Sequence, residues 1–186
     1  MEKIETHIVV DMLYDFIDGS LACQNGTQAV VESIKYINEH PMQKVLYVCD
    51  CHPIDHCSFK EYGGTWPIHC VKGTHGGAIH QDYYTKIKKA ENRPTVKNTF
   101  YKGCNKNVEE YSGYMSVNTN GEIIHSIVSH SVAVSGIATE YCIKETVLNL
   151  YKHGYNVTLL KDALAYVSPH GHLETLIELG KIVTVK

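Results

Sequence analysis

Short apolar runs alternate with segments of helical periodicity along this chain, and that alternation constrains the fold more than any other feature. A continuous apolar run is typical of a strand that is buried on both faces of a sheet. We expect such strands at residues 8–10, 45–48, 95–98, 132–134, 157–160 and 182–185.

The segments between these runs predict helices. After Thr27, the residues Val30, Ile34 and Ile37 recur at helical spacing, and Pro41 follows closely enough to help end that helix. Further helices are expected from residue 120 or 121, from residue 139 to a glycine stop at residue 154, and after residue 169. A long irregular stretch, rich in Gly, His and Cys, covers residues 49–92.

Strands that alternate with helices over the whole length predict an α/β fold, with a mostly parallel, doubly wound sheet and helices on both of its faces. No internal repeat or low-complexity linker divides the chain. We therefore expect one domain over residues 1–186, a length that can enclose a hydrophobic core.

The composition favours a globular protein that acts on a small molecule. Hydrophobic residues make up 44% and charged residues 20%, and the net charge of −3 with no Lys/Arg-rich run argues against nucleic-acid binding. The apolar run at residues 7–10 is too short for a signal peptide or a membrane span, so we expect a cytoplasmic protein with no membrane partner. The seven cysteines are an odd number, and we expect reduced thiols.

Polar residues follow several of the predicted strands at the point where each strand ends. Asp11 follows the first strand, Asp50 and His52 follow the second, and Lys102 follows the strand near residue 96. Cys142 lies in the first turn of the helix that begins near residue 139. Because ligands of parallel sheets bind beyond the carboxyl ends of the strands, these side chains are expected to gather on one rim.

Cys142 is the expected nucleophile of this rim. The positive end of a helix and a nearby lysine both favour thiolate over thiol, and helix N–H groups can hold an oxyanion. Asp11 can take the thiol proton and later give it to a leaving amine. The structural alternatives are a buried core cysteine, a helix-capping Asp11 and a solvated Lys102.

A second group of residues has the spacing of metal ligands. Asp50 and His52 point to the same side of an extended chain, and His69 from a distant loop supplies a third ligand while leaving coordination positions open. Such a mixed set suits Zn²⁺, Mn²⁺ or Fe²⁺. The alternatives are a polar loop without metal and a structural zinc site, although the C-x-x-C pair typical of the latter is absent. Phe16 and Trp66 are candidates for flanking a flat aromatic substrate, or else pack in the core.

The chain resembles the nicotinamidases of the isochorismatase-like cysteine hydrolase superfamily in several motifs, which appear in the same order over nearly the whole length. These motifs are Asp11 with Asp15-Phe16, Asp50-Cys51-His52-Pro53, His56-Cys57-Ser58-Phe59, Gly64-Thr65-Trp66-Pro67-Ile68-His69-Cys70, Lys102 with Tyr111-Ser112-Gly113, and Gly136-Ile137-Ala138-Thr139-Glu140-Tyr141-Cys142. The segment around Cys142 is the most specific of them.

The resemblance implies a three-layer, Rossmann-like fold with a six-stranded sheet. It also implies a catalytic triad of Asp11, Lys102 and Cys142, and one divalent metal, first of all zinc, on Asp50, His52 and His69. Some relatives use a residue near His56 as well, so His56 is a possible fourth ligand, and Ser58 and Glu61 are weaker candidates for contacts through water. The backbone N–H groups of Ala138 and Cys142 would form an oxyanion hole beside a cis peptide between Ile137 and Ala138.

The implied reaction is the hydrolysis of nicotinamide to nicotinate and ammonia through a Cys142 thioester, a step of NAD salvage. The metal would bind the pyridine nitrogen, and Phe16, Trp66 and Ile137 would contact the ring. Homo-oligomers are common among such relatives. The chain departs from the family pattern at Leu13, where glutamine is usual, and at Cys51, where tryptophan is usual.

Two other functions compete with this interpretation. One is a hydrolase of the same superfamily that acts on another amide or a ureide; such members generally lack the Asp-x-His and His cluster. The other is a metal- or redox-binding protein without catalysis, in which the cysteine-rich loop acts as a sensor.

Overall fold

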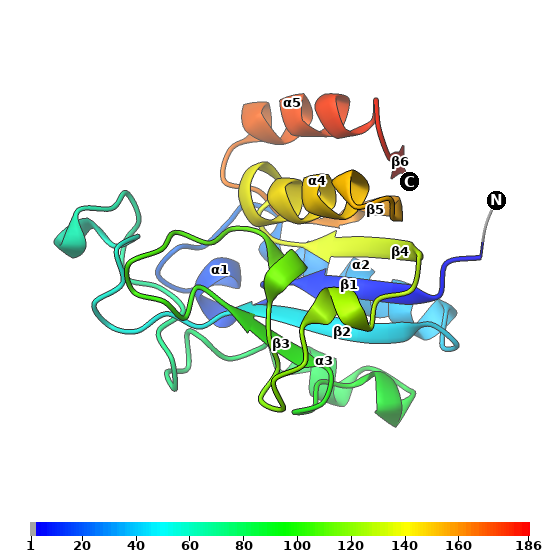
Figure 1. Ribbon diagram of the computed structural model, residues 1–186, viewed down its shortest axis with the longest axis horizontal. Helices are drawn as coiled ribbons and strands as arrows, with labels where there is room; N and C mark the ends of the chain where they lie inside the picture. The colour runs from blue at the N-terminus through cyan, green and yellow to red at the C-terminus, as the bar shows by residue number, and fades with distance from the viewer. Residues whose placement is uncertain (1–2) are drawn as a thin grey trace.

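The computed structural model describes residues 3–186 and contains a six-stranded parallel sheet (Figure 1). The strand order is β3-β2-β1-β4-β5-β6, and every pairing is parallel. The strands are β1 (Thr6–Val10), β2 (Lys44–Asp50), β3 (Thr99–Lys102), β4 (Ser131–Gly136), β5 (Asn156–Leu164) and β6 (Thr184–Val185). The expected α/β class is thus confirmed.

Helices cover both faces of the sheet. Alternate residues of each strand face opposite sides, and on both sides these residues are apolar and packed against helices. On one face, Val9 and Tyr47 pack with Val30 and Ile34 of α2 (Gly26–Glu39). On the other face, strand residues including Ile8 pack with α4 (Lys144–Lys152) and α5 (Pro169–Leu179). The remaining α-helices are α1 (Tyr14–Ile17) and α3 (Asp82–Thr85). Burial on both faces explains why the strands are continuous apolar runs.

The third strand begins later than expected. Residues 95–98 form a turn in which the Asn98 carboxamide oxygen accepts from the Thr95 backbone N–H at 2.7 Å, while its amide group donates to Val45 O at 3.2 Å. The strand follows as β3, from Thr99 to Lys102. The strand prediction is wrong for residues 95–98 because the Asn98 side chain closes a turn there.

The helix expected near residue 120 is also wrong. The Asn118 side chain accepts from the backbone N–H of both Asn120 and Glu122, and it fixes a tight turn instead. Only a 3₁₀ turn, Ile124–Ser126, follows. The helix expected from residue 139 starts as a π-helix, Thr139–Ile143, and continues as α4; it stops before Gly154, which has a φ of 85° as expected for such a stop.

Strands β1, β2, β3 and β4 end at one edge of the sheet, to the left in Figure 1, where long connections also lie; β6 pairs with the first part of β5 and lies to the right. At this edge Gly136 ends β4 with a φ of 135°. A Cβ atom on Gly136 would lie 2.0 Å from the Val10 carbonyl oxygen, so only glycine lets β1 and β4 remain paired here. Within residues 3–186, no helix is long and apolar enough to cross a membrane.

His7 is a buried titratable group near the start of β1, at the other end of this strand from Asp11. Its Nε2 lies 2.8 Å from the Ser135 hydroxyl, and its Nδ1 has no hydrogen-bond partner. Burial, helped by the nearby His40, lowers the pKa of His7 to about 3. At a pH between this pKa and the ordinary histidine pKa of about 6.5, His7 is protonated in the unfolded chain and neutral in the folded chain. The folded state therefore loses stability as the pH falls below about 6.5.

We predict that His7→Gln removes this part of the acid sensitivity. Between about pH 6 and pH 4, the free energy of unfolding should fall more steeply for the natural chain, by up to about 1.4 kcal/mol per pH unit. Urea unfolding at a series of pH values measures this difference. Parallel pH profiles for the two proteins would show that His7 is protonated equally in both states.

Candidate active site

Asp11 stands directly after β1 and turns its side chain toward the neighbouring strands. Its backbone φ is 51°, and its N–H donates to Val48 O of β2 at 2.8 Å. One carboxylate oxygen accepts from the Asp50 backbone N–H at 2.8 Å, and the other lies 2.9 Å from Lys102 Nζ. The carboxylate is fully buried, so it depends on these partners.

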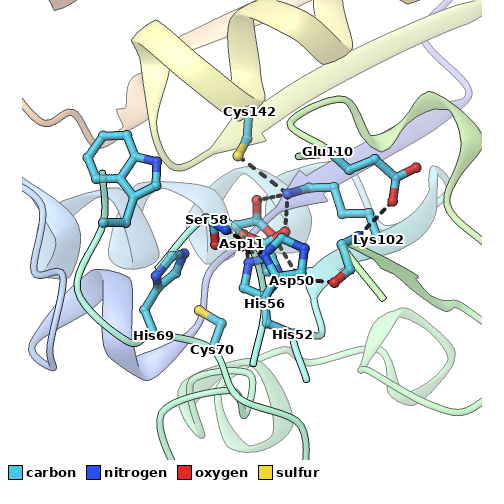
Figure 2. A network of polar contacts seen from close by, with 12 residues as sticks. Asp11, Asp50, His52, His56, Ser58, His69, Cys70, Lys102, Glu110 and Cys142 are labelled. Carbon is cyan, nitrogen blue, oxygen red and sulfur yellow. Dashed lines mark hydrogen bonds and ion pairs between the residues drawn. The ribbon is translucent and has the colours of Figure 1, made fainter. Parts of the chain in front are cut away.

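Lys102 ends β3 and is almost completely buried. The β2–β3 register pairs Asp50 with Lys102, and the ammonium group forms ion pairs with both Asp11 and Asp50 (Figure 2). Burial opposes the charge, but the two carboxylates outweigh it and hold the pKa of Lys102 well above its ordinary value. Lys102 is the least supported of the three catalytic candidates on sequence grounds, yet its ammonium group contacts both Asp11 and Cys142.

Cys142 faces this ammonium group from the π-helix, with its Sγ 3.4 Å from Lys102 Nζ. Burial raises the pKa of the Cys142 thiol well above its ordinary value; Lys102 lowers it, while Asp11 and Asp50 raise it further. Lys102 thus favours the thiolate, as expected, but burial and the two carboxylates together outweigh its effect. The Cys142 thiol therefore keeps its proton, and its Sγ lies within 4.8 Å of an Asp11 carboxylate oxygen.

Asp11 is suited to exchange that proton. Burial, with a contribution from Asp50, raises the pKa of Asp11 to about 6, although Lys102 acts in the opposite direction. A carboxyl group with this pKa can both accept and return a proton near neutral pH. The arrangement can therefore support nucleophilic chemistry that starts from a neutral thiol.

Asp50, His52 and His69 lie beside this cluster, and their ligand atoms are all within 4.8 Å of one another. His52 Nδ1 lies 2.9 Å from Gly103 O and His69 Nδ1 lies 2.8 Å from Pro67 O. Because a carbonyl only accepts, each Nδ1 carries a proton, which leaves each Nε2 to bind a metal; His52 Nε2 lies 3.4 Å from an Asp50 carboxylate oxygen. Metal-binding histidines usually donate their other ring N–H to a carbonyl or carboxylate in this way, so the residues fit a divalent metal.

Asp11, Asp50 and Cys142 also lie close together, but they make a poor metal site. The Lys102 ammonium group already contacts all three side chains and supplies the positive charge there. The structure thus separates a cluster built around a lysine from a cluster that can bind a metal, and Asp50 belongs to both.

His56 is not part of the three-residue metal cluster. Its Nδ1 accepts from the Ser58 backbone N–H at 3.2 Å and lies 2.7 Å from the Ser58 hydroxyl. Its Nε2 lies 3.2 Å from Val108 O, so both ring nitrogens have protein partners. Glu61 has an exposed side chain in the 3₁₀ turn Lys60–Tyr62. A metal held by Asp50, His52 and His69 would therefore keep positions open for water or a substrate.

A narrow pocket opens above both clusters. Phe16 and Trp66 line it as expected, together with Ala138. Ile137 does not line it: its side chain is fully buried in the core on the α2 side, and only the adjoining Ala138 reaches the pocket. The expected cis peptide between Ile137 and Ala138 is present.

Sequence reasoning missed several lining residues: Leu21, Cys23, Glu109, Tyr111, Tyr141 and Val167. They come from connections without periodicity, and their approach depends on how the loops fold. Tyr111 accepts a hydrogen bond from Trp66 Nε1 at 3.1 Å, and the Trp66 and Tyr141 rings meet edge to face. The only available signal was position, because Tyr111 lies in the segment after Lys102 and Tyr141 precedes Cys142.

Comparison with known proteins gives one family and a consistent set of relatives. The family model described as the isochorismatase domain matches residues 5–185. A nicotinamidase/pyrazinamidase from Mycobacterium tuberculosis is 31% identical over 181 residues, which cover 92% of each chain. A nicotinamidase from Escherichia coli is 28% identical over 181 residues, covering 83% of this chain and 80% of the relative.

Solved structures agree with these relatives. The pyrazinamidase of Pyrococcus horikoshii in complex with zinc superposes with a TM-score of 0.83 at 30% identity, over 99% of both chains. PnC1 from L. infantum in complex with nicotinate gives a TM-score of 0.79 at 29% identity, over 98% of this chain and 92% of the other.

We predict that His52→Ala lowers the amount of zinc bound per chain. The substitution removes one of the three proposed protein ligands. Loss of a residue that only hydrogen-bonds to a ligand lowers metal affinity by roughly 10- to 100-fold, so loss of a ligand itself should lower it at least as much. Metal analysis after dialysis against a weak chelator measures the effect. His170→Ala, which changes an exposed histidine in α5, serves as the matched control. Equal zinc in all three proteins would remove His52 from the metal site.

Proposed function

This chain belongs to the isochorismatase family, and we propose that it is a nicotinamidase that hydrolyses nicotinamide to nicotinate and ammonia. The main support for this proposal is that a buried Asp11–Lys102–Cys142 cluster and an Asp50–His52–His69 cluster meet at one narrow pocket. The first cluster suits attack on a carboxamide, and the second suits a ligand with a basic ring nitrogen. The nicotinamidase and pyrazinamidase relatives support the same substrate class.

In the proposed reaction, Asp11 takes the thiol proton of Cys142, and the resulting thiolate attacks the carboxamide carbon. The backbone N–H groups of Ala138 and Cys142 stabilise the oxyanion. Asp11 then returns its proton to the departing ammonia, which leaves a thioester on Cys142. Asp11 next accepts a proton from water as the water attacks the thioester, and nicotinate and the free thiol are released.

Lys102 keeps this chemistry possible in a buried site. Its charge balances Asp11 and Asp50, which otherwise would lie close together as like charges. It also lies beside Cys142 Sγ and can stabilise the thiolate as soon as Asp11 has taken the proton. The lysine acts as a fixed counter-ion, because its pKa is held well above the working range.

Asp50, His52 and His69 would hold one divalent cation, with zinc as the first choice and manganese or iron as alternatives. When bound, the metal supplies a Lewis acid that fixes the pyridine nitrogen and so orients the ring. Phe16 and Trp66 would lie against the ring, since both side chains line the pocket. Location in the cytoplasm is part of the same proposal.

The proposal predicts that purified protein releases ammonia from nicotinamide, and that Cys142→Ala lowers turnover by about 10⁴-fold or more, as loss of a nucleophile usually does. Bound zinc should stay at the natural level in this variant, because Cys142 is not a metal ligand. Cys57→Ala, which alters a thiol outside the site, is the matched control. Full ammonia release by Cys142→Ala would overturn the assignment of the nucleophile.

Chelation tests the second cluster. A strong chelator should reduce turnover and raise the KM for nicotinamide, and added Zn²⁺ should restore both, because the metal is proposed to bind the substrate ring. Absence of turnover by fully metal-loaded protein would refute nicotinamide as the substrate while leaving the fold unchanged.

A further inference from the structure

Gly103 joins the proposed catalytic lysine to the proposed metal-binding histidine. It directly follows Lys102, and its carbonyl oxygen lies 2.9 Å from His52 Nδ1. Its φ is 64°, and a Cβ atom here would lie 2.4 Å from His52 Cε1 and 2.7 Å from His52 Nδ1. The His52 imidazole thus packs directly against Gly103. Because Gly103 has no side chain, only contacts of its backbone can fix its position.

Glu110 holds that backbone. The Gly103 N–H donates to Glu110 Oε2 at 2.9 Å, and Glu110 reaches back from the loop that leaves β3 (Figure 2). Gly103 is buried, so removal of the carboxylate would leave a buried donor without its partner. The contact therefore fixes the position of Gly103, and through Gly103 O it fixes the proton on His52 Nδ1.

We propose that Glu110 is a positioning residue of the metal centre, acting through Gly103 on His52. The inference rests on the proposed function only in taking Asp50, His52 and His69 as metal ligands. A carboxylate suits this place because its hydrogen bond to the Gly103 N–H is charge-assisted. Zinc affinity should therefore depend on a side chain that touches neither the metal nor the substrate.

Zinc affinity, measured by competition with a chromophoric chelator, tests this directly. We expect Glu110→Ala to weaken binding by about 10-fold or more, as loss of an outer partner does, and Glu110→Gln to recover most of it because its amide oxygen can still accept. Glu110→Asp keeps the charge but is one methylene too short, so it should also bind zinc more weakly. Glu91→Ala, an exposed acidic residue elsewhere, is the charge control and should match the natural chain.

The visible spectrum of the Co²⁺-loaded protein gives a second readout, since it reports the geometry of the ligands rather than turnover. A changed spectrum in Glu110→Ala or Glu110→Asp, restored in Glu110→Gln, would support the proposal. Affinities within twofold of the natural chain and unchanged spectra in both variants would overturn it. If the natural chain binds neither Zn²⁺ nor Co²⁺, the metal site itself is refuted, and this result is distinct from a failure of Glu110 alone.

A separate observation concerns the thiols on the other side of this junction. Cys51 stands between Asp50 and His52, and Cys104 follows Gly103. The Cys51 N–H donates to Lys102 O at 2.9 Å, and Cys104 Sγ lies 3.8 Å from the same oxygen. Both cysteines thus contact the same carbonyl oxygen; Cys104 is exposed and Cys51 is half-buried. No disulfide joins them.

We infer that Cys51 and Cys104 form an oxidisable dithiol that reacts with a small disulfide such as glutathione disulfide. Cys104 Sγ attacks the disulfide and releases one glutathione thiol; Cys51 Sγ then displaces the second, and the two protein hydrogens end on the two glutathione thiols. The new bond would tie the end of β2 to the loop after β3. That bond would restrain the chain between Asp50 and His52 and weaken zinc binding.

Mass spectrometry of the Cys142→Ala protein tests this without interference from the proposed nucleophile. After treatment with glutathione disulfide, we expect the chain to lose the mass of two hydrogens and non-reduced peptides to show Cys51 joined to Cys104. Cys51→Ser in the same background should instead retain a glutathione adduct on Cys104. A persistent adduct on Cys104 while Cys51 is present, or no reaction at either thiol, would overturn the inference.

Discussion

The buried ammonium group of Lys102 is the interaction on which the site depends. It forms ion pairs with Asp11 after β1 and with Asp50 at the end of β2, and it also contacts Cys142. The side chains of three residues therefore meet at the Lys102 nitrogen. Breaking a buried ion pair by removing one partner typically costs about 3–5 kcal/mol, a large part of the roughly 5–15 kcal/mol by which a domain is stable. Asp50 and Lys102 face each other only because β2 and β3 pair in one register, since a shift of one residue would turn one of the two side chains to the opposite face.

Two conditions shape the chemistry at this nitrogen. Burial alone would keep Asp11 protonated and Lys102 neutral, whereas their mutual attraction favours the charged forms. The balance leaves Lys102 charged, Asp11 with a pKa of about 6, and Cys142 as a thiol. Catalysis by such a site needs proton transfer within the cluster rather than a preformed thiolate.

Much of this could be predicted from the sequence, and the reason is the parallel sheet. Asp11, Asp50 and Lys102 each follow a strand, and the shared edge brings them together whatever the loops do. The errors arose where local side-chain hydrogen bonds override periodicity, as at Asn98 and Asn118. The walls of the pocket could not be predicted, because Tyr111 and Glu109 reach it through irregular connections, and the role of Gly103 depends on a φ that no pattern reports.

The contacts of the rim join residues far apart in the chain: 39 positions separate Asp11 from Asp50, 52 separate Asp50 from Lys102, and 40 separate Lys102 from Cys142. No single hairpin or helix can bring these groups together during folding. Each contact can form only after the long connection between the two parallel strands has brought them side by side. A partly folded chain, with β1 and β2 paired but β3 still free, would hold two carboxylates without their cation. Lys102 therefore links the pairing of β3 with β2 to the assembly of the polar cluster. A folding intermediate without β3 has neither the complete cluster nor the stability that these ion pairs contribute.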